Sequence, residues 1–510
     1  MELNDLSLFL AANWFSISFV VCSSIILYFW GIAPFRRSTI VAAVGDVPGP
    51  TPLPFVGNIL DLIKFKGQFH LQIDHYYKKY GRLFTMFLFE KKPSLVVSDP
   101  EMLKEIMVKE FQSFHDRPDL MELPKPFDSM MTAAKGETWH RIRTTLSPTF
   151  SAHKMKLMIP LLNKSCDLLD KKLEHDAETG KTINIYKYYQ GLTMEAILAT
   201  FFGIDCNAQN DYDDPAFKAG RNSLDPGPVR RFITGLIAVV PFGPYLVKFF
   251  PSFFIGQFQD LVHLTEKMIE AKRSGDSNQR KDVLGLMLNH TNDQDVPENK
   301  RLTESEVIAQ SMVFLFAGYE TTSNVLSLAC HHIATSPNVQ EKLQKEIDEV
   351  WSDEDQAPSY DVVQSLPYLD MVISETLRLY PPAFATTREC TKDCVIKGLP
   401  IKKGTSIFTA VYSMHRDPEF FPDPDTFDPE RFSVDAKASR DPYTYHPFSH
   451  GPRNCIGMRF AQMQMKLAIV RILKKFNFVV APETKIPPVV EVKQILGCSD
   501  GIFLKVERRH

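Results

Sequence analysis

The sequence predicts a mainly α-helical protein with small β-sheets, built as a single large domain behind an N-terminal transmembrane helix. Apolar residues recur at helical spacing in segments 100–110, 154–175, 260–271, 337–351 and 458–475. Strand candidates are short and lie within 83–98, 394–409 and 477–506. No repeat, low-complexity tract or further linker interrupts residues 56–510, so we take them as one domain although the chain length would suit about three domains of ~150 residues.

The composition argues against two classes of protein. Lys and Arg number 58 against 61 Asp and Glu, and a net charge of −3 offers no basic field for nucleic acid. The eight cysteines are scattered along 510 residues, which argues against a disulfide framework. A reducing compartment such as the cytosol therefore suits the body of the protein.

Residues 1–35 predict a membrane anchor. The run from Leu6 to Pro34 contains no charged residue and is long enough to cross ~30 Å of hydrocarbon as a helix. A secretory signal peptide is the alternative, and the acidic start and the lack of a small-residue cleavage site argue against it. Arg36 and Arg37 follow the run directly, so the positive-inside rule places the body on the cytosolic side.

Two further segments bear on how the body meets the membrane. Residues 36–55 read as a proline-rich linker, whose four prolines from Pro48 to Pro54 predict a stiff extended chain. Residues 230–256 are too broken by proline to span a bilayer and very apolar for exposed loops. We interpret them as short helices dipping into the membrane, with a buried core as the alternative.

One helix is predicted to be unusually long. Thr303 and Glu306 fit a capping box, and the apolar-rich run that follows continues to Pro337, about 33 residues or ~50 Å. Within it lies AGYETT, where Gly318 costs about 1 kcal/mol of helix stability. Either Gly318 allows close helix packing, or the helix opens locally and frees backbone and hydroxyl groups for a ligand or water.

The segment SETLRLYPP predicts a buried ion pair. Glu375 and Arg378 are three residues apart and so share one helical face. Their apolar neighbours suggest that the pair is buried and needs further partners. Arg431, in the proline-rich stretch PERF, is a candidate to complete the network.

The segment FSHGPRNCIG surrounds Cys455 with residues suited to holding a thiolate. Gly451 and Gly457 allow tight turns, and the run that follows predicts a helix whose N-terminus faces the sulfur. Arg453 can neutralise a carboxylate of a cofactor, and Phe448 can cover the sulfur. Nearby cysteines or histidines do not complete a zinc site, so a single thiolate indicates haem.

The motifs F-x-x-G-x-R-x-C-x-G, E-x-x-R at 375–378 and A-G-x-E-T at 317–321 resemble those of the haem-thiolate monooxygenases, the cytochrome P-450 family. The anchor, the proline hinge and W-x-x-x-R at Trp139 and Arg143 extend the likeness to the whole chain. The sequence is most similar to the microsomal subfamily 3A and its relatives, which include thromboxane synthase. The resemblance implies the cytochrome P-450 fold.

The resemblance also implies a role for each motif residue. Cys455 would be the proximal thiolate ligand of haem b, iron protoporphyrin IX. The residues implied to bind the haem propionates are Trp139, Arg143, Arg388, Arg453 and, as a fifth, Arg117. Glu375, Arg378 and Arg431 would lock the fold around the cysteine loop. Thr321 and Glu320 would deliver protons during oxygen activation.

Substrate contact is implied for a mostly apolar set of residues. They are Phe127, Thr132, Phe316, Ala317, Ala383, Phe384, Ala385 and Gly497. Their character predicts a lipophilic substrate of steroid, fatty-acid or xenobiotic type. Ala385 stands where subfamily 3A commonly has an arginine, which changes the polar contacts expected of the pocket.

The expected function is a monooxygenase of the endoplasmic reticulum membrane with its catalytic domain on the cytosolic side. It would insert one oxygen atom from O2, using electrons from NADPH through a diflavin flavoprotein reductase, with cytochrome b5 as a second partner. Two alternatives remain: a haem-thiolate isomerase of endoperoxides, like thromboxane synthase, and a non-catalytic haem sensor or carrier. Glu320 and Thr321 argue against both, because neither alternative uses proton delivery.

A basic face is predicted on the thiolate side of the haem, where an acidic reductase domain would dock. It would be formed by His140, Arg141, Lys154, Lys156, Arg459 and Lys466. A solvated face of two unrelated helices is the alternative.

Overall fold

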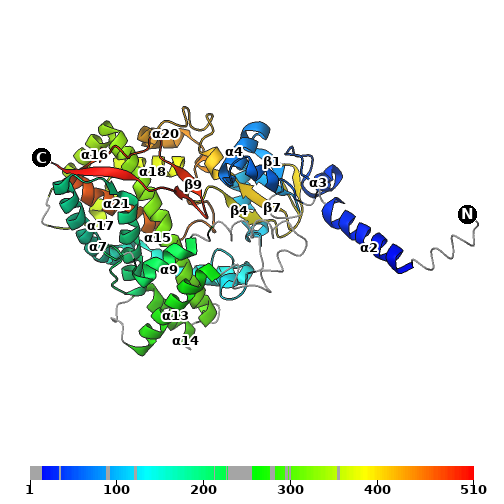
Figure 1. Ribbon diagram of the computed structural model, residues 1–510, viewed down its shortest axis with the longest axis horizontal. Coiled ribbons are helices and arrows are strands. Elements are labelled where there is room, and N and C mark those ends of the chain that lie inside the picture. Colours follow the sequence, from blue (N-terminus) through cyan, green and yellow to red (C-terminus); the bar gives the residue numbers. More distant parts are fainter. Residues whose placement is uncertain are drawn as a thin grey trace, which may run out of the picture.

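The computed structural model describes residues 14–33, 36–54, 56–87, 92–119, 123–211, 213–224, 227, 256–275, 282–292, 297, 300–352 and 356–509. Over these residues the protein is mainly helical with small sheets, as predicted (Figure 1). The helices are α2 (Trp14–Gly31), α3 (Arg37–Val44), α4 (Phe69–Tyr80), α5 (Pro100–Lys104), α6 (Gly136–Leu146), α7 (Ala152–Thr179), α8 (Ile185–Ile197), α9 (Pro215–Leu224), α13 (Gln259–Ser274), α14 (Val283–Asn292), α15 (Glu304–Thr335), α16 (Pro337–Val350), α17 (Tyr360–Gln364), α18 (Pro367–Leu379), α19 (Val411–Met414), α20 (Val434–Ser439) and α21 (Met458–Lys475).

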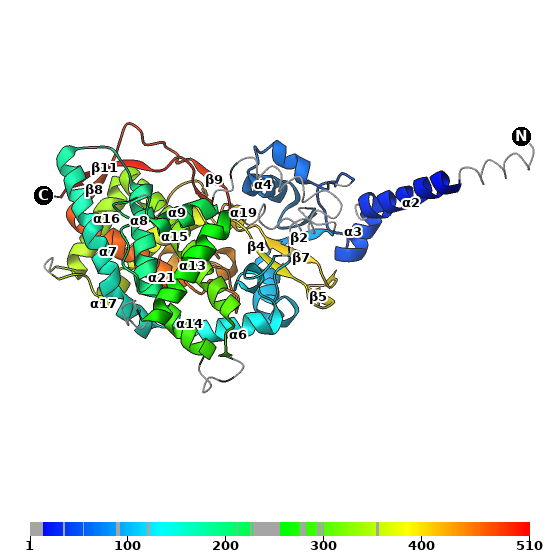
Figure 2. The same ribbon diagram turned by 60° about the horizontal axis from the view of Figure 1, so that its bottom comes forward.

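Helix α15 runs through the middle of the helical body, with α8, α13, α18 and α21 packed around it (Figure 2). It begins with the predicted capping box: Glu306 N donates to Thr303 Oγ1 at 3.2 Å, and Thr303 N donates to Glu306 Oε2 at 2.8 Å. The helix ends at Thr335, and Pro337 then starts α16 in the first helical turn, where a missing N–H costs little. The long central helix is therefore confirmed.

The other helices predicted from apolar spacing are also present. Segment 154–175 lies within α7, 260–271 within α13 and 337–351 largely within α16, and 458–475 is α21. Segment 100–110 divides into α5 and a π-helical turn, Glu105–Lys109. The apolar periodicity thus located these helices, with differences only at their ends.

The strands form small sheets at the edges of the helical body. The larger sheet has the order β1 (Leu83–Met86), β2 (Ser94–Val97), β7 (Ser406–Thr409), β4 (Thr386–Glu389), with β2 and β7 parallel. A second sheet has the order β3 (Ile183–Asn184), β11 (Phe503–Arg508), β8 (Phe476–Val480). Two hairpins pair β5 (Cys394–Ile396) with β6 (Leu399–Ile401), and β9 (Val490–Val492) with β10 (Leu496–Cys498).

The N-terminal region differs from its prediction. Helix α2 projects away from the body in both views (Figures 1 and 2), but no helix of the described residues is both long and apolar enough to cross a membrane. Helix α2 has 18 residues, ~27 Å at 1.5 Å per residue, and the first 13 residues of the predicted anchor lie outside the described part. The apolar segment 230–256 also lies outside it, apart from Gly256.

The predicted extended linker at 36–55 contains a helix instead. Ile40 and Val44 of α3 are buried in the apolar cluster that also includes residues of β1, β2 and α4. The proline-rich part is tied to the sheet, because Thr85 N donates to Pro48 O at 2.8 Å. Residues 36–55 are therefore ordered by burial of the apolar face of α3, whereas their prolines alone had predicted an extended linker.

Candidate active site

Cys455 lies in the loop that leads into α21. The backbone N–H groups of Gly457 and Met458, at the start of that helix, hydrogen-bond to its sulfur and favour the thiolate, as do the charges of Arg143 and Arg117. Burial is nevertheless the largest influence and raises the pKa of Cys455. The thiol still has exposed surface, so its sulfur forms part of the wall of a recess inside the protein.

The cysteine loop depends on one glycine. Gly451 has φ of +75°, and a Cβ there would lie 2.0 Å from Met107 O, so a side chain is excluded by both conformation and contact. Cys455 N closes the loop by donating to Phe448 O at 2.9 Å. Gly457 has φ of −85°, and a Cβ there would meet only Phe150, at 3.9 Å. Of the two glycines predicted to permit tight turns, only Gly451 is required by the fold.

Four arginines gather beside Cys455, and they influence one another's ionisation. Burial and then neighbouring arginines lower the pKa of both Arg388 and Arg453 to about 9. The Nε atoms of Arg117, Arg388 and Arg453 are buried without a hydrogen-bond partner among the described residues. Asp116 lies 3.5 Å from Arg453, and that one carboxylate cannot balance four cations. The donor set therefore fits a ligand that carries carboxylates, as haem does through its two propionates.

The remaining predicted propionate contacts are oriented by protein groups. Arg143 Nη2 donates to Asn454 Oδ1 at 2.8 Å, next to the cysteine. The guanidinium carbon of Arg453 lies 4.4 Å from the centre of the Trp139 ring. Trp139 thus positions an arginine by a cation–π contact, in addition to the direct role predicted for it.

One strip of α15 is not buried, although the helix lies inside the body. Val313, Ala317 and Thr321 are spaced by four residues and so share a face, and all three retain exposed surface. Thr321 Oγ1 donates to Ala317 O at 2.6 Å. This strip lines internal space and presents a hydroxyl group there.

The predicted opening of α15 at AGYETT is wrong. The helix is continuous from Glu304 to Thr335. A Cβ on Gly318 would lie 2.7 Å from Ile197 Cδ1, so the glycine permits close packing of α15 against α8. The packing interpretation of Gly318 is therefore the correct one.

The Glu320 carboxylate is held in a polar site formed by residues of α8 and α15. It accepts hydrogen bonds from Tyr186, from Gln190 Nε2 at 3.2 Å and from Asn324 Nδ2 at 2.9 Å. Sequence reasoning missed these partners. Asn324 could have been found, because it lies one helical turn after Glu320, whereas Tyr186 and Gln190 belong to α8, which was not predicted.

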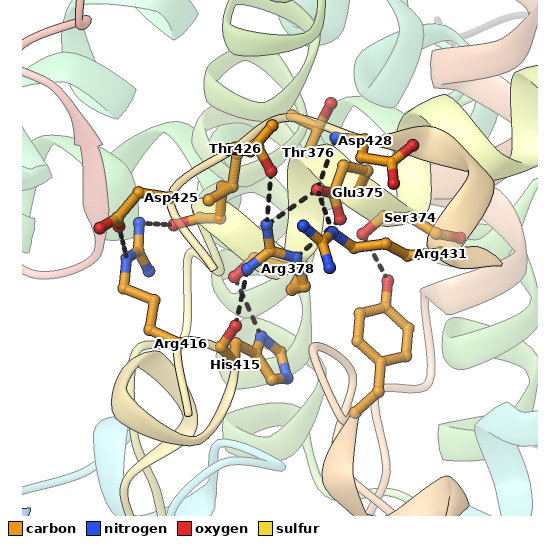
Figure 3. A network of polar contacts seen from close by, with 12 residues as sticks. Ser374, Glu375, Thr376, Arg378, His415, Arg416, Asp425, Thr426, Asp428 and Arg431 are labelled. Carbon is orange, nitrogen blue, oxygen red and sulfur yellow. Dashed lines mark hydrogen bonds and ion pairs between the residues drawn. The ribbon is translucent and has the colours of Figure 1, made fainter. Parts of the chain in front are cut away.

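The Glu375–Arg378 pair is fully buried and completed by backbone groups (Figure 3). Arg378 donates to both oxygens of Glu375, at 2.7 and 2.8 Å, and also to the carbonyls of His415 and Thr426. Arg431 Nε lies 3.5 Å from Glu375 Oε1. The network joins α18 to the segments on either side of residue 428, and the lock on the cysteine loop that the resemblance implied stays a prediction.

Comparison with known proteins matches this arrangement to a family. The family model for cytochrome P450 matches residues 47–506. The chain is 37% identical to cytochrome P450 3A6 of Oryctolagus cuniculus over 96% of each chain, and 40% identical to cytochrome P450 3A2 of Rattus norvegicus over 90% of this chain and 91% of that one. It is 38% identical to human cytochrome P450 3A5 over 96% of this chain and 95% of the relative.

The chain belongs to the cytochrome P450 family. Its family and its 3A relatives make it a monooxygenase, an oxidoreductase, and membership implies a haem-thiolate cofactor. The recess beside Cys455, where Asp116 is the one carboxylate described against four arginines, fits such a cofactor on chemical grounds that are independent of the likeness.

The residues that the P450 resemblance assigned to substrate contact lie in four different places. Phe127 and Phe316 flank Phe258, with ring centres 5.6 and 6.3 Å away, and Ala317 lies on the unburied strip. Thr132 and Ala383 are exposed. Phe384 and Ala385 pack instead against the cluster that contains α4, where Phe384 meets the Phe69 ring edge-on at 6.0 Å. Gly497 faces Asn324, on the polar side of α15.

The predicted basic face of this P450 is smaller than expected. Arg141 Nη1 donates to Glu306 at 2.9 Å, and Lys156 pairs with Asp361 at 2.9 Å. Lys466 is buried and paired with Asp370 at 2.7 Å. Arg459 is exposed and Lys154 is half-buried, so these two keep positive charge at the surface, and His140 is also exposed.

Proposed function

We propose that this P450 is a membrane-bound monooxygenase that inserts one oxygen atom from O2 into lipophilic substrates, with electrons from NADPH delivered through a flavoprotein reductase. The observation that carries the proposal is the Cys455 sulfur, met by two helix N-terminal amides and flanked by four arginines for which the described residues supply one carboxylate, Asp116. Such a site holds a thiolate and a dianionic cofactor together.

The residues that would hold haem each have a distinct task. Cys455 would ligate the iron, and the amides of Gly457 and Met458 favour its thiolate form against burial, which raises its pKa. Arg388 and Arg453, together with Arg117 and Arg143, would bind the propionates. Haem, when bound, supplies the oxidation chemistry that side chains lack.

The protein's own contribution to turnover is control of protons. Thr321 Oγ1 rests on Ala317 O, and its hydroxyl can turn to donate into the internal space that the strip lines. We assign Glu320 as the acid that resupplies Thr321, because it is the adjacent residue on α15 and is held by three donors. Without either group, oxidation would proceed with poor coupling and release hydrogen peroxide.

The substrate class follows from the apolar lining. Phe127, Phe258 and Phe316 form a group of aromatic rings, and Phe316 precedes Ala317 on α15. A site of this kind suits steroids, fatty acids or lipophilic xenobiotics. Binding of such compounds can be measured as shifts of the haem absorption band, with a polar sugar as the control that should give none.

Reconstitution tests the proposed reaction. Holoenzyme in lipid with an NADPH-dependent diflavin reductase should form oxygenated product only when NADPH and O2 are both present, and cytochrome b5 should raise the rate. In Thr321→Ala and Glu320→Gln variants, product per NADPH should fall while hydrogen peroxide rises. Conversion of an endoperoxide without NADPH would instead establish the isomerase, and absence of any turnover would leave the haem sensor.

Membrane attachment is proposed from the uncharged run 6–34, with the body on the cytosolic side of the endoplasmic reticulum. Deletion of residues 1–35 should release part of the protein from membranes with its haem retained. The remaining membrane-bound fraction should depend on segment 230–256. Complete solubility of the truncated protein without salt or detergent would contradict the role of that second segment.

A further inference from the structure

Glu320 occupies a built polar site on α15, three residues after Ala317. Its carboxylate is about nine-tenths buried and receives hydrogen bonds from Tyr186, Gln190 and Asn324. Burial, and then the nearby carboxylate, raise the pKa of Tyr186, so the phenol keeps its proton and acts as a donor. Three donors on one carboxylate fix its direction.

Asn324 ties this carboxylate to the C-terminal hairpin. Its Nδ2 donates to both the side chain and the backbone carbonyl of Glu320, each at 2.9 Å, and its Oδ1 accepts from Cys498 N at 2.7 Å. A Cβ on Gly497 would lie 2.3 Å from Asn324 Oδ1, so the glycine lets β10 lie directly against α15. Asn324 therefore fixes the position of the β9–β10 hairpin relative to Glu320.

A small pocket connects this carboxylate with the surface. Its volume is about 40 Å³, which admits one or a few waters but no substrate. The lining residues that matter here are Glu320 and Asn324 at one end and Ser499 along the wall. Glu491 and Lys493 also line it and are exposed, so the other end reaches solvent.

We propose that this pocket is the proton entry route of the enzyme, and that Tyr186 and Asn324 are positioning residues that hold Glu320 at its inner end. The proposal rests on the proposed role of Glu320 in proton delivery. A hydronium ion in the pocket gives one proton to a carboxylate oxygen of Glu320, leaving water and a neutral carboxyl. The carboxyl gives that proton to Thr321 Oγ1 as the Thr321 hydroxyl gives its own proton to the O2 undergoing reduction. Glu320 returns to the carboxylate, so one net proton moves inward and Glu320 exchanges no electron.

The same hydrogen bonds control when Glu320 moves. A carboxylate accepts stronger hydrogen bonds than a neutral carboxyl, so Tyr186 and Asn324 hold the unloaded form more tightly than the loaded one. Protonation therefore loosens the side chain and lets it turn toward Thr321, one residue further along α15. After delivery, the restored charge draws the side chain back to the pocket.

The test uses two variants of the holoenzyme and a matched control for each. Tyr186→Phe removes one donor. Its control is Tyr188→Phe, also on α8, which loses a similar bond to Asp176 of α7. Ser499→Leu fills the pocket, and Val489→Leu enlarges an exposed residue near the hairpin outside the pocket. We expect Tyr186→Phe and Ser499→Leu to raise the peroxide formed per NADPH several-fold, and the controls to match the wild type.

A second readout does not depend on turnover. The infrared band of the Glu320 carboxylate is the one lost in Glu320→Gln, and it should shift in Tyr186→Phe but not in Tyr188→Phe. An unshifted band, or normal coupling in both Tyr186→Phe and Ser499→Leu while Glu320→Gln leaks peroxide, overturns the entry route and leaves the role of Glu320 intact. Normal coupling in Glu320→Gln would instead overturn the proposed function of that residue.

Discussion

The arginines beside Cys455 place the apoprotein under electrostatic repulsion. Arg388 is 2% exposed, and its pKa is lowered to about 9 by burial and by Arg117 and Arg453. A buried cation without a matched anion destabilises the folded state, whereas the carboxylates of a bound cofactor reverse the sign of the interaction. The same residue should therefore have opposite effects in the two forms of the protein.

Arg388→Met should stabilise the apoprotein by about 1–2 kcal/mol and weaken its retention of haem. The apoprotein gains stability because one charge is removed from a group of like charges. The holoenzyme retains haem less well because a donor to a propionate is removed. Urea unfolding of the apoprotein and the haem-to-protein ratio of the purified holoenzyme measure the two effects. Arg459→Met, at an exposed position, should change neither, and equal destabilisation of both forms by Arg388→Met would refute the argument.

Removing a charge from the Glu375–Arg378 pair should lower stability, whereas removing the charge of Arg388 should raise it. Glu375 and Arg378 are both fully buried and exchange two hydrogen bonds, so removing one charge leaves the other unpaired in the interior. Glu375→Gln should lower the free energy of unfolding by about 3–5 kcal/mol. Glu430→Gln, which breaks an exposed pair with Lys342, should cost less than about 1 kcal/mol. Similar losses in chemical denaturation for both variants would contradict this account.

At the scale of elements, the cysteine loop is fixed by its contact with the π-helical turn that follows α5. Gly451→Ala would place a methyl group 2.0 Å from Met107 O in a left-handed conformation. We expect a loss of about 3 kcal/mol or more and failure to retain haem. Gly398→Ala is the matched control, because φ is +81° there and nothing lies within 4 Å of the added Cβ. Gly398→Ala should lose only the stability that a left-handed backbone costs an alanine. The difference in thermal unfolding between the two variants therefore measures the cost of the contact with Met107 O.

The sequence predicted helices whose apolar residues recur at a clear helical spacing, and it missed α8. Helices α7, α13 and α16 alternate buried and exposed residues with the helical period, which made them visible. Helix α8 is buried at every position from Gly191 to Ile197, so that part of it shows no polar face. The partners of Glu320 were lost with it, because its direction depends on α8 and on a hairpin about 170 residues further along the chain.

Motifs located the cysteine, the arginines and the buried pair because each chemical role constrains residue type within a few positions. Substrate contacts are set by longer-range packing. Phe384 follows α18 closely in sequence, yet its ring packs toward α4, against Phe69 and His70. Lys466 likewise has the sequence appearance of a surface residue of α21, but pairs with Asp370 in a buried position. Local sequence does not encode which neighbour an amphipathic side chain meets.

At the scale of the whole molecule, the charge that remains on the thiolate side determines how an electron donor can approach. Arg141 is committed to Glu306 at the start of α15, and Lys466 to Asp370. Arg459, in the first turn of α21, and Lys154, in the first turn of α7, have no ion pair within the described part of the chain. They lie on elements adjacent to the Cys455 loop, where an acidic flavoprotein domain would be steered by long-range attraction.

Charge reversal should therefore separate docking from folding. Lys154→Glu combined with Arg459→Glu should slow electron transfer from the reductase several-fold at low salt, and the difference should shrink as salt screens the attraction. Substrate-binding spectra and haem content should stay unchanged, because neither residue contacts the recess. Lys437→Glu, on α20, is the control for net charge. Arg141→Glu should instead lower the free energy of unfolding, because it places a second carboxylate against Glu306. For the double variant, stopped-flow reduction across a salt series measures the rate of electron transfer. A rate equal to that of Lys437→Glu at low salt would exclude this face as the docking site.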